Sequence, residues 1–148
     1  MGRFITKLML LFTLFASNFA FAEPPVFLNG EGVALTGYDP VAYFTDNKPV
    51  QGQKAISFRY QDATYYFASE AHREAFQANP EKYLPQYGGY CAYGASFGHK
   101  APGDPTQWSV VNGKLYINYN ERVQQQWTAA RDATIEKADK VWVDIKNK

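Results

Sequence analysis

The side chains that could bind a metal ion or act as a nucleophile are few, and they lie close together in the chain. The sequence contains two histidines, His72 and His99, and one cysteine, Cys91. A thiolate and neutral imidazoles are ligands that zinc and copper accept. The same residues could instead form a thiolate that an imidazole activates. Because the sequence contains no CxxC, HxxxH or HExxH motif, spacing does not decide between a metal site and a nucleophilic pair.

Four further side chains are candidates for the lining of a ligand pocket. Asp39 precedes Pro40 in a turn-forming segment, and Tyr87, Tyr90 and Tyr93 recur at every third position near the cysteine. The tyrosines could form an aromatic wall, or they could simply pack their own segment. Asp39 could equally bond its own backbone in a turn.

Each metal-ligand candidate also has a structural alternative. His72 could be a hydrogen-bonded core histidine, because Ala75 and Phe76 fall on its side of the predicted helix. Cys91 could be a small buried apolar residue. His99 could be a solvent-facing loop residue.

A β-hairpin and a helix are predicted to position His72. Residues 55–60 alternate between apolar and polar side chains, and 64–68 are β-branched and aromatic, which is typical of paired strands. Ser69 is a typical N-cap, and the stretch 70–78 contains no glycine or proline. We therefore expect a helix that carries His72 in its first turn.

Cys91 and His99 lie in a segment, 85–105, that contains five glycines and three prolines. The composition predicts a loop, and a long loop inside a compact domain is more often functional than idle. The two histidines and the cysteine can therefore meet only if this loop folds back over the helix that carries His72.

The C-terminal half is predicted to form a second hairpin and a long helix. Asn112-Gly113 is a strong hairpin signal, and a two-residue turn pairs Val110 with Leu115 and Trp108 with Ile117. From 120 to 145, apolar residues recur at spacings of three or four, which predicts one amphipathic helix. The core is expected to include the following side chains: Trp108, Val110, Leu115, Ile117 and Trp127.

The first 22 residues have the pattern of a secretory signal peptide. A basic head, Arg3 and Lys7, precedes an apolar run over 8–15 and the small-x-small sequence Ala20-Phe21-Ala22. The run is too short for a comfortable membrane anchor. We therefore expect a mature chain, 23–148, that forms one domain in the periplasm with no membrane span.

The composition of the chain excludes several classes of partner and site. The 148-residue chain is 46% hydrophobic and 20% charged, which suits a folded globular protein. With 15 basic and 14 acidic residues and no block of like charge, a nucleic acid is not an expected partner. A single cysteine excludes an internal disulfide. Both methionines, Met1 and Met9, lie in the predicted signal, which excludes a methionine-ligated copper site in the mature chain.

The segment around His72 resembles a known family. The stretches 65–76 and 79–83 are similar to the YHS domain, and 37–44 and 86–92 are similar to exported bacterial members; the likeness covers about 33–118. This resemblance implies metal binding, since YHS and related modules are proposed to bind metal. Their metal-binding versions carry cysteines on the strand-to-helix segment, where this chain has Ala68 and His72.

Together these observations predict an α+β fold in which a small antiparallel sheet, built from hairpins, packs with a short helix and a long C-terminal helix. We expect a protein that binds a small ligand or a metal ion, copper or zinc, through His72, Cys91 and His99, rather than one that turns over a substrate. Two alternatives stay open at this point. One is a thiol-dependent enzyme that uses Cys91 with a histidine base, and the other is an interaction module of a periplasmic protein assembly.

Overall fold

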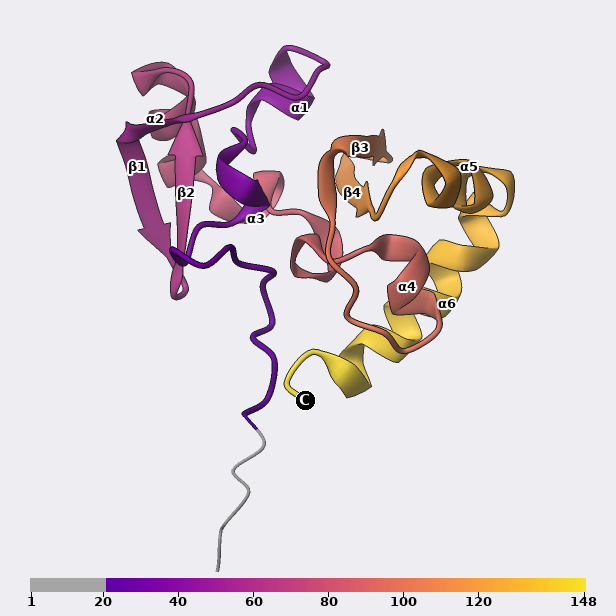
Figure 1. The fold of residues 1–148 in the computed structure, drawn as a ribbon. Helices are drawn as coiled ribbons and strands as arrows, with labels where there is room; N and C mark the ends of the chain where they lie inside the picture. The colour runs from indigo at the N-terminus through magenta and orange to yellow at the C-terminus, as the bar shows by residue number, and fades with distance from the viewer. Residues whose placement is uncertain (1–20) are drawn as a thin grey trace, which may run out of the picture.

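The computed structural model describes residues 21–148 and shows the predicted α+β fold (Figure 1). The predicted signal peptide lies outside the described residues except for Phe21 and Ala22. In residues 21–148, no helix combines the length and the apolar character needed to cross a membrane. The elements are, in order, η1 (Leu35–Gly37), α1 (Ala42–Thr45), β1 (Gln53–Tyr60), β2 (Ala63–Phe67), α2 (Glu70–Ala78), α3 (Pro80–Tyr83), η2 (Gln86–Gly89), α4 (Ala92–Ser96), β3 (Asp104–Val111), β4 (Lys114–Asn118), α5 (Glu121–Ala129) and α6 (Arg131–Ile145).

The first hairpin pairs β1 with β2 in antiparallel register, as predicted, and packs against α2. Alternate residues of β2 point into the core, so Tyr65 and Phe67 are buried against Phe76 of α2. Helix α2 begins after Ser69, whose hydroxyl oxygen accepts the N–H of His72 at 3.2 Å. The predicted N-cap is therefore confirmed, and it fixes His72 in the first turn of the helix.

The second hairpin has the predicted register, with Val110 opposite Leu115 and Trp108 opposite Ile117. Leu115 and Ile117 are fully buried. Trp108 and Val110 are only half-buried, so the prediction that they lie in the core was too strong. Among the described residues, β4 is also bridged on its other edge, by Pro85 and Cys91, whereas β3 has only β4 as a strand partner.

The single helix predicted over 120–145 is wrong in one respect, because it is broken at Ala130. That residue leaves the helical region, with φ −128° and ψ 33°, and it separates α5 from α6. Figure 1 shows the two helices running in different directions. Trp127 of α5 and Ala138 of α6 are both buried in one cluster with Tyr116 of β4. The break therefore lets α5 pack on the second hairpin while α6 packs mainly against α4.

The two hairpins are joined through Tyr43 of α1. Its hydroxyl donates a hydrogen bond of 2.7 Å to the carbonyl of Pro105, at the start of β3. Its ring packs against Trp108, with centroids 5.3 Å apart. Burial raises the pKa of Tyr43 far above its usual value, so the hydroxyl stays protonated as a donor.

Lys100 connects both ends of the described chain. Its ammonium group donates hydrogen bonds to the carbonyls of Glu23, Lys146 and Lys148, at 2.9, 2.9 and 3.0 Å. The same group lies over the rings of Tyr90 and Trp142. Removal from water lowers the pKa of Lys100. One side chain thus holds the lead-in segment against the end of α6.

Candidate functional site

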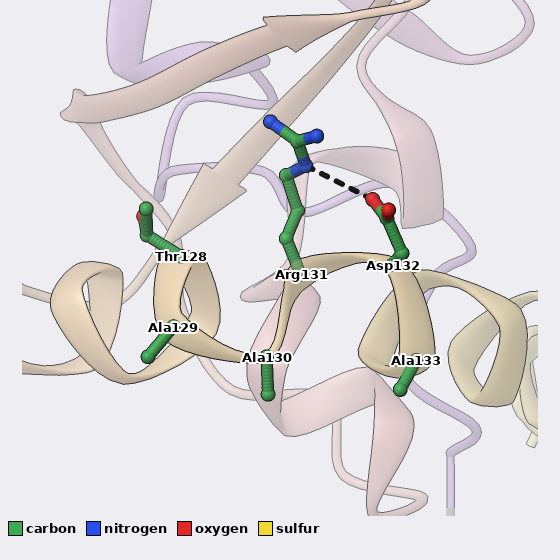
Figure 2. A pocket seen from close by; sticks show the side chains of 6 residues that line it. All are labelled: Thr128, Ala129, Ala130, Arg131, Asp132 and Ala133. Carbon is green, nitrogen blue, oxygen red and sulfur yellow. Dashed lines mark hydrogen bonds and ion pairs between the residues drawn. The ribbon is translucent and has the colours of Figure 1, made fainter.

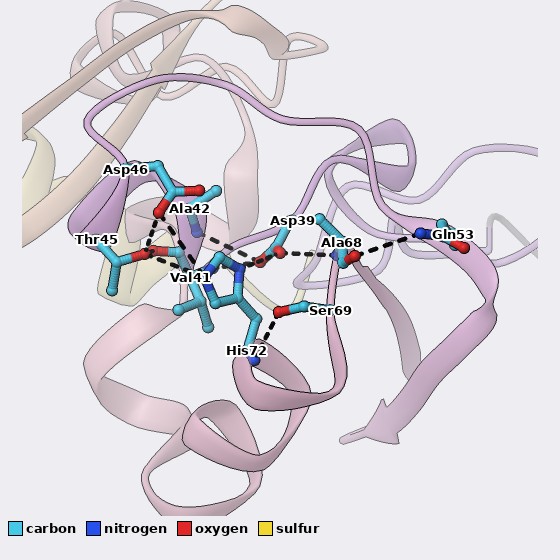
Figure 3. A network of polar contacts seen from close by, with 9 residues as sticks. All are labelled: Asp39, Val41, Ala42, Thr45, Asp46, Gln53, Ala68, Ser69 and His72. Atoms are coloured by element: carbon cyan, nitrogen blue, oxygen red, sulfur yellow. Dashed lines mark hydrogen bonds and ion pairs between the residues drawn. The ribbon is translucent and has the colours of Figure 1, made fainter.

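Asp39 is the anchor of a polar network at the junction of α1, β2 and α2 (Figure 3). Its side chain is fully buried. Oδ1 accepts the N–H groups of Val41 and Ala42, at 2.8 and 3.3 Å, and Oδ2 accepts the N–H of Ala68 at 2.9 Å. Three backbone donors therefore stabilise the charge of a carboxylate that has no contact with water. Asp39 does bond its own turn, as one interpretation of the sequence had it, and it also reaches a second element.

That second element is α2, because Oδ2 of Asp39 also lies 2.6 Å from Nδ1 of His72. An ionised carboxylate can only accept hydrogen bonds, so Nδ1 carries the hydrogen. In the neutral ring, Nε2 then holds a free lone pair. The side chain of His72 is 18% exposed. Asp39 therefore fixes the orientation of the His72 ring, and Nε2 is the ring nitrogen that faces the surface.

Thr45 and Asp46, at the end of α1, lie next to that nitrogen. Nε2 of His72 is 3.3 Å from Oγ1 of Thr45 and 3.8 Å from Oδ1 of Asp46. The hydroxyl and the carboxylate oxygen are 3.0 Å apart. Three electron-pair donors therefore meet at one point, where they can accept a proton or a cation. The sequence did not point to Thr45 or Asp46 as site residues. Their only distinguishing feature in the sequence is that they follow the turn at Asp39.

Cys91 lies elsewhere, buried at the N-terminus of α4. Its sulfur accepts the N–H of Gly94 at 3.4 Å and lies 3.6 Å from the amide oxygen of Asn118. Asn118 is itself fully buried and bonds the side chain of Gln124. In the described residues, neither histidine is within hydrogen-bonding distance of the thiol. The cysteine thus acts as a helix cap inside a buried polar network.

His99 follows α4 and is exposed to solvent. Its backbone N–H donates to the carbonyl of Gly94 at 3.0 Å. In the part of the chain that the structure describes, no three His, Cys, Asp or Glu side chains are grouped so that they could hold one metal ion. The structure therefore does not bring His72, Cys91 and His99 together. The segment between them is less loop-like than predicted, since it contains η2 and α4.

Tyr87 and Tyr90 pack the fold in places that the sequence did not indicate. The hydroxyl of Tyr87 donates to Asp139 of α6 at 2.8 Å, and its ring lies against Trp142. Burial, together with the bond to Asp139, raises the pKa of Tyr87. The hydroxyl of Tyr90 donates to the carbonyl of Pro24 at 2.8 Å. Both side chains are buried; Tyr87 connects η2 to α6, and Tyr90 connects the residue after η2 to the lead-in segment.

Tyr93 differs from the other two tyrosines because it is only half-buried. It packs edge-on against the exposed ring of Phe97, with centroids 5.1 Å apart. Tyr87 and Tyr90 both pack against Trp142, whereas Tyr93 packs against Phe97, so the three tyrosines do not form one shared wall.

A surface hollow of about 440 Å³ lies where α5 meets α6 (Figure 2). It is lined by residues 128–133, half of which are alanines, with an ion pair of 3.1 Å between Arg131 and Asp132. The hollow contains none of the candidate site residues. Arg131 and Asp132 pair with each other, and the hydroxyl of Thr128 donates to the carbonyl of Gln124.

The comparisons with known proteins concern the same segment as the network around His72. Neither the curated proteins nor the solved structures provide a match to this chain. A family model does match, and its matched segment runs from the start of α1 to Tyr87. That segment includes Thr45, Asp46 and His72, and it begins two residues after Asp39. The matching family model is the YHS domain, and it covers residues 41–87.

Proposed function

We propose that this protein is a periplasmic metal-binding protein in which Nε2 of His72 is the first ligand of a zinc or copper(II) ion. The periplasmic location is inferred from the signal-like sequence 1–22. The YHS match supports metal binding at the level of the family. The observation that carries the proposal is the 2.6 Å contact between Asp39 and Nδ1 of His72.

This contact is the arrangement that metal-ligating histidines use. Such a histidine almost always donates its other ring N–H to a carboxylate or carbonyl, which fixes the ring and makes the ligating nitrogen more basic. Asp39 does this from a fully buried position that three backbone N–H groups hold in place. The residues present therefore fit a metal ion whose first ligand is Nε2.

The kinds of donor near Nε2 favour particular ions. An imidazole nitrogen beside a carboxylate and a hydroxyl suits zinc and copper(II), whereas copper(I) prefers sulfur. Cys91 is the only cysteine of the chain, and its sulfur is occupied as a buried cap. When bound, the ion would supply Lewis acidity at the surface. The chain's own part is to fix the ring of His72 through Asp39, with Nε2 directed toward Thr45 and Asp46.

The thiol-dependent enzyme is less well supported than metal binding. A reactive cysteine is partially exposed in an electropositive setting, whereas Cys91 is only 2% exposed and its neighbours are Gly94 and Asn118. Both groups are uncharged, and neither can act as a general base for the thiol.

The test is metal binding by the mature chain, 23–148, purified from the exported fraction. Elemental analysis gives the native metal content, and calorimetric titration of the metal-free protein gives the affinity for zinc and for copper(II). We expect one ion per chain, a loss of binding in His72→Ala, and unchanged binding in His99→Ala. His99 is a matched control because it is an exposed histidine outside the network.

Three results would contradict the proposal. The first is a wild-type chain that binds neither ion, and the second is a His72→Ala variant that binds as tightly as the wild type. The third is a joint loss of binding in Cys91→Ser and His99→Ala. That loss would mean that the three residues predicted from the sequence assemble only when the metal arrives.

A further inference from the structure

We infer that Asp46 and Thr45 supply the second and third ligands of the ion that His72 binds, so that the site lies between the end of α1 and the start of α2. This inference rests on the proposed function and concerns how the ion is held. Neither residue was indicated by any pattern in the sequence, and both enter because of where the structure places them (Figure 3).

The distances between the three donor atoms suit one small ion. From Nε2 of His72, Oγ1 of Thr45 lies at 3.3 Å and Oδ1 of Asp46 at 3.8 Å, and the two oxygens are 3.0 Å apart. Two ligands of a tetrahedral zinc ion, each about 2.0–2.2 Å from the metal, are about 3.4 Å from each other. The triangle of donors thus needs shifts of only a few tenths of an ångström to face a common ion.

A single buried carboxylate positions both sides of this triangle. Oδ1 of Asp39 accepts the first free N–H groups of α1, from Val41 and Ala42, and so sets the direction of the short helix that ends at Thr45. Oδ2 holds the ring of His72 on α2. Because both oxygens belong to one rigid group, a shift of α1 relative to His72 would break hydrogen bonds to Asp39. The triangle is therefore held in advance of any ligand.

The position of the triangle suits an ion that enters from solution. The Asp46 side chain is 38% exposed and the His72 side chain is 18% exposed, so the donors face the surface while Asp39 lies behind them. The negative charge of Asp46 also gives the cluster an attraction for a cation that neutral donors alone would lack. Sites with three protein ligands leave the remaining coordination to water.

Asp46→Asn and Thr45→Val test the inference by calorimetric titration with zinc. Asp46→Asn should weaken binding by more than about 10-fold, because loss of even an indirect partner of a metal ligand costs about 10–100-fold. Thr45→Val should weaken binding less, and Thr45→Ser, which keeps the hydroxyl, should bind like the wild type. Asp62→Asn is the matched control, since Asp62 is almost fully exposed and, among the described residues, pairs only with Arg59. Circular dichroism confirms that each variant is folded.

A spectroscopic measurement adds a readout that does not depend on affinity. Copper(II) bound to the wild type should show electron paramagnetic resonance couplings from one imidazole nitrogen and a ligand field dominated by oxygen.

If Asp46→Asn and Thr45→Val both bind zinc as the wild type does while His72→Ala does not, the inference is wrong and the proposed function stands. If the wild type binds neither zinc nor copper(II), both the proposed function and this inference are wrong. A copper spectrum with two imidazole nitrogens or with sulfur would also overturn the inference.

Discussion

Asp39 and His72 are 33 positions apart in the sequence, and their side chains are joined by a contact of 2.6 Å between Oδ2 and Nδ1. The other oxygen of the carboxylate accepts the N–H groups that open α1. One buried group therefore fixes the first turn of two helices and the orientation of one imidazole. The orientation of His72 in the candidate site depends on this pair.

Replacement of Asp39 by Asn should weaken zinc binding by about 10–100-fold, because an amide NH₂ facing Nδ1 favours the wrong imidazole tautomer. It should also lower the free energy of unfolding by about 1–3 kcal/mol, since one side of the amide cannot accept the N–H groups that the carboxylate accepts. Calorimetry and urea unfolding measure the two effects. Asp62→Asn serves as the control. An Asp39→Asn chain that binds zinc normally would show that the tautomer is not set by this residue.

Stability should fall at alkaline pH because of buried tyrosines. Burial raises the pKa of Tyr43, Tyr65 and Tyr87 in the folded chain, whereas unfolded tyrosines ionise near pH 10. The folded state binds these protons more tightly, so the stabilisation is complete below about pH 10 and is lost as the pH rises above it. Urea unfolding at pH 8 and pH 11 measures the loss.

Tyrosine variants identify the source of that alkaline effect. Tyr43→Phe should lose stability at pH 8, because the carbonyl of Pro105 loses its donor, but it should show a smaller further loss at pH 11. Tyr119→Phe is the control, since Tyr119 is exposed. Equal alkaline losses in the wild type and in Tyr43→Phe would assign the effect to other groups.

Trp127 should be the most costly side chain of α5 to truncate. It is buried against Tyr116, with ring centroids 5.3 Å apart, so Trp127→Ala should cost about 3–5 kcal/mol in urea unfolding. Trp127→Phe should cost clearly less, because the indole N–H finds no acceptor among the described residues and its removal leaves no partner unsatisfied. A loss below about 1 kcal/mol for Trp127→Ala would mean that α5 is peripheral.

Variants at two glycines with positive φ distinguish the cost of backbone strain from the cost of a steric clash. Gly88, at φ +63°, faces the carbonyl of Pro25, with which an added Cβ would collide, whereas Gly113, at φ +74°, has open space around it. Gly113→Ala should therefore cost about 1–2 kcal/mol from strain alone. Gly88→Ala should cost more, because the lead-in segment must also move. Similar losses for the two variants would show that the Pro25 contact adds nothing.

The parts of the fold that local patterns determine could be predicted from the sequence. Asn112-Gly113 set the register of the second hairpin, because both residues adopt the positive φ that such a turn requires. Ser69 marked the start of α2. The break at Ala130 could not be predicted, because the segment contains no glycine or proline and the apolar stripe continues through it. Packing of Trp127 and Ala138 on one cluster accompanies that break.

The candidate site was only partly accessible from the sequence for a related reason. His72 and Asp39 were both candidates, but spacing along the chain does not reveal that a turn residue meets a helix residue across the core. Asp46 and Thr45 had no pattern at all, since they owe their position to the direction of α1. Cys91 was selected for its chemistry, and the structure gives it a capping role that its residue type does not indicate.

The contacts of Lys100 place residues 23 and 148 close enough for the chain to be circularly permuted. Its ammonium group holds the carbonyls of Glu23 and Lys148 within 3.0 Å, so residues 23 and 148 are neighbours in space. A short flexible linker between them would close the chain into a ring with little distortion. New ends opened in the exposed turn at Gly113 would then give a circular permutant with the same core and the same His72 network, in which Lys100 holds a continuous loop.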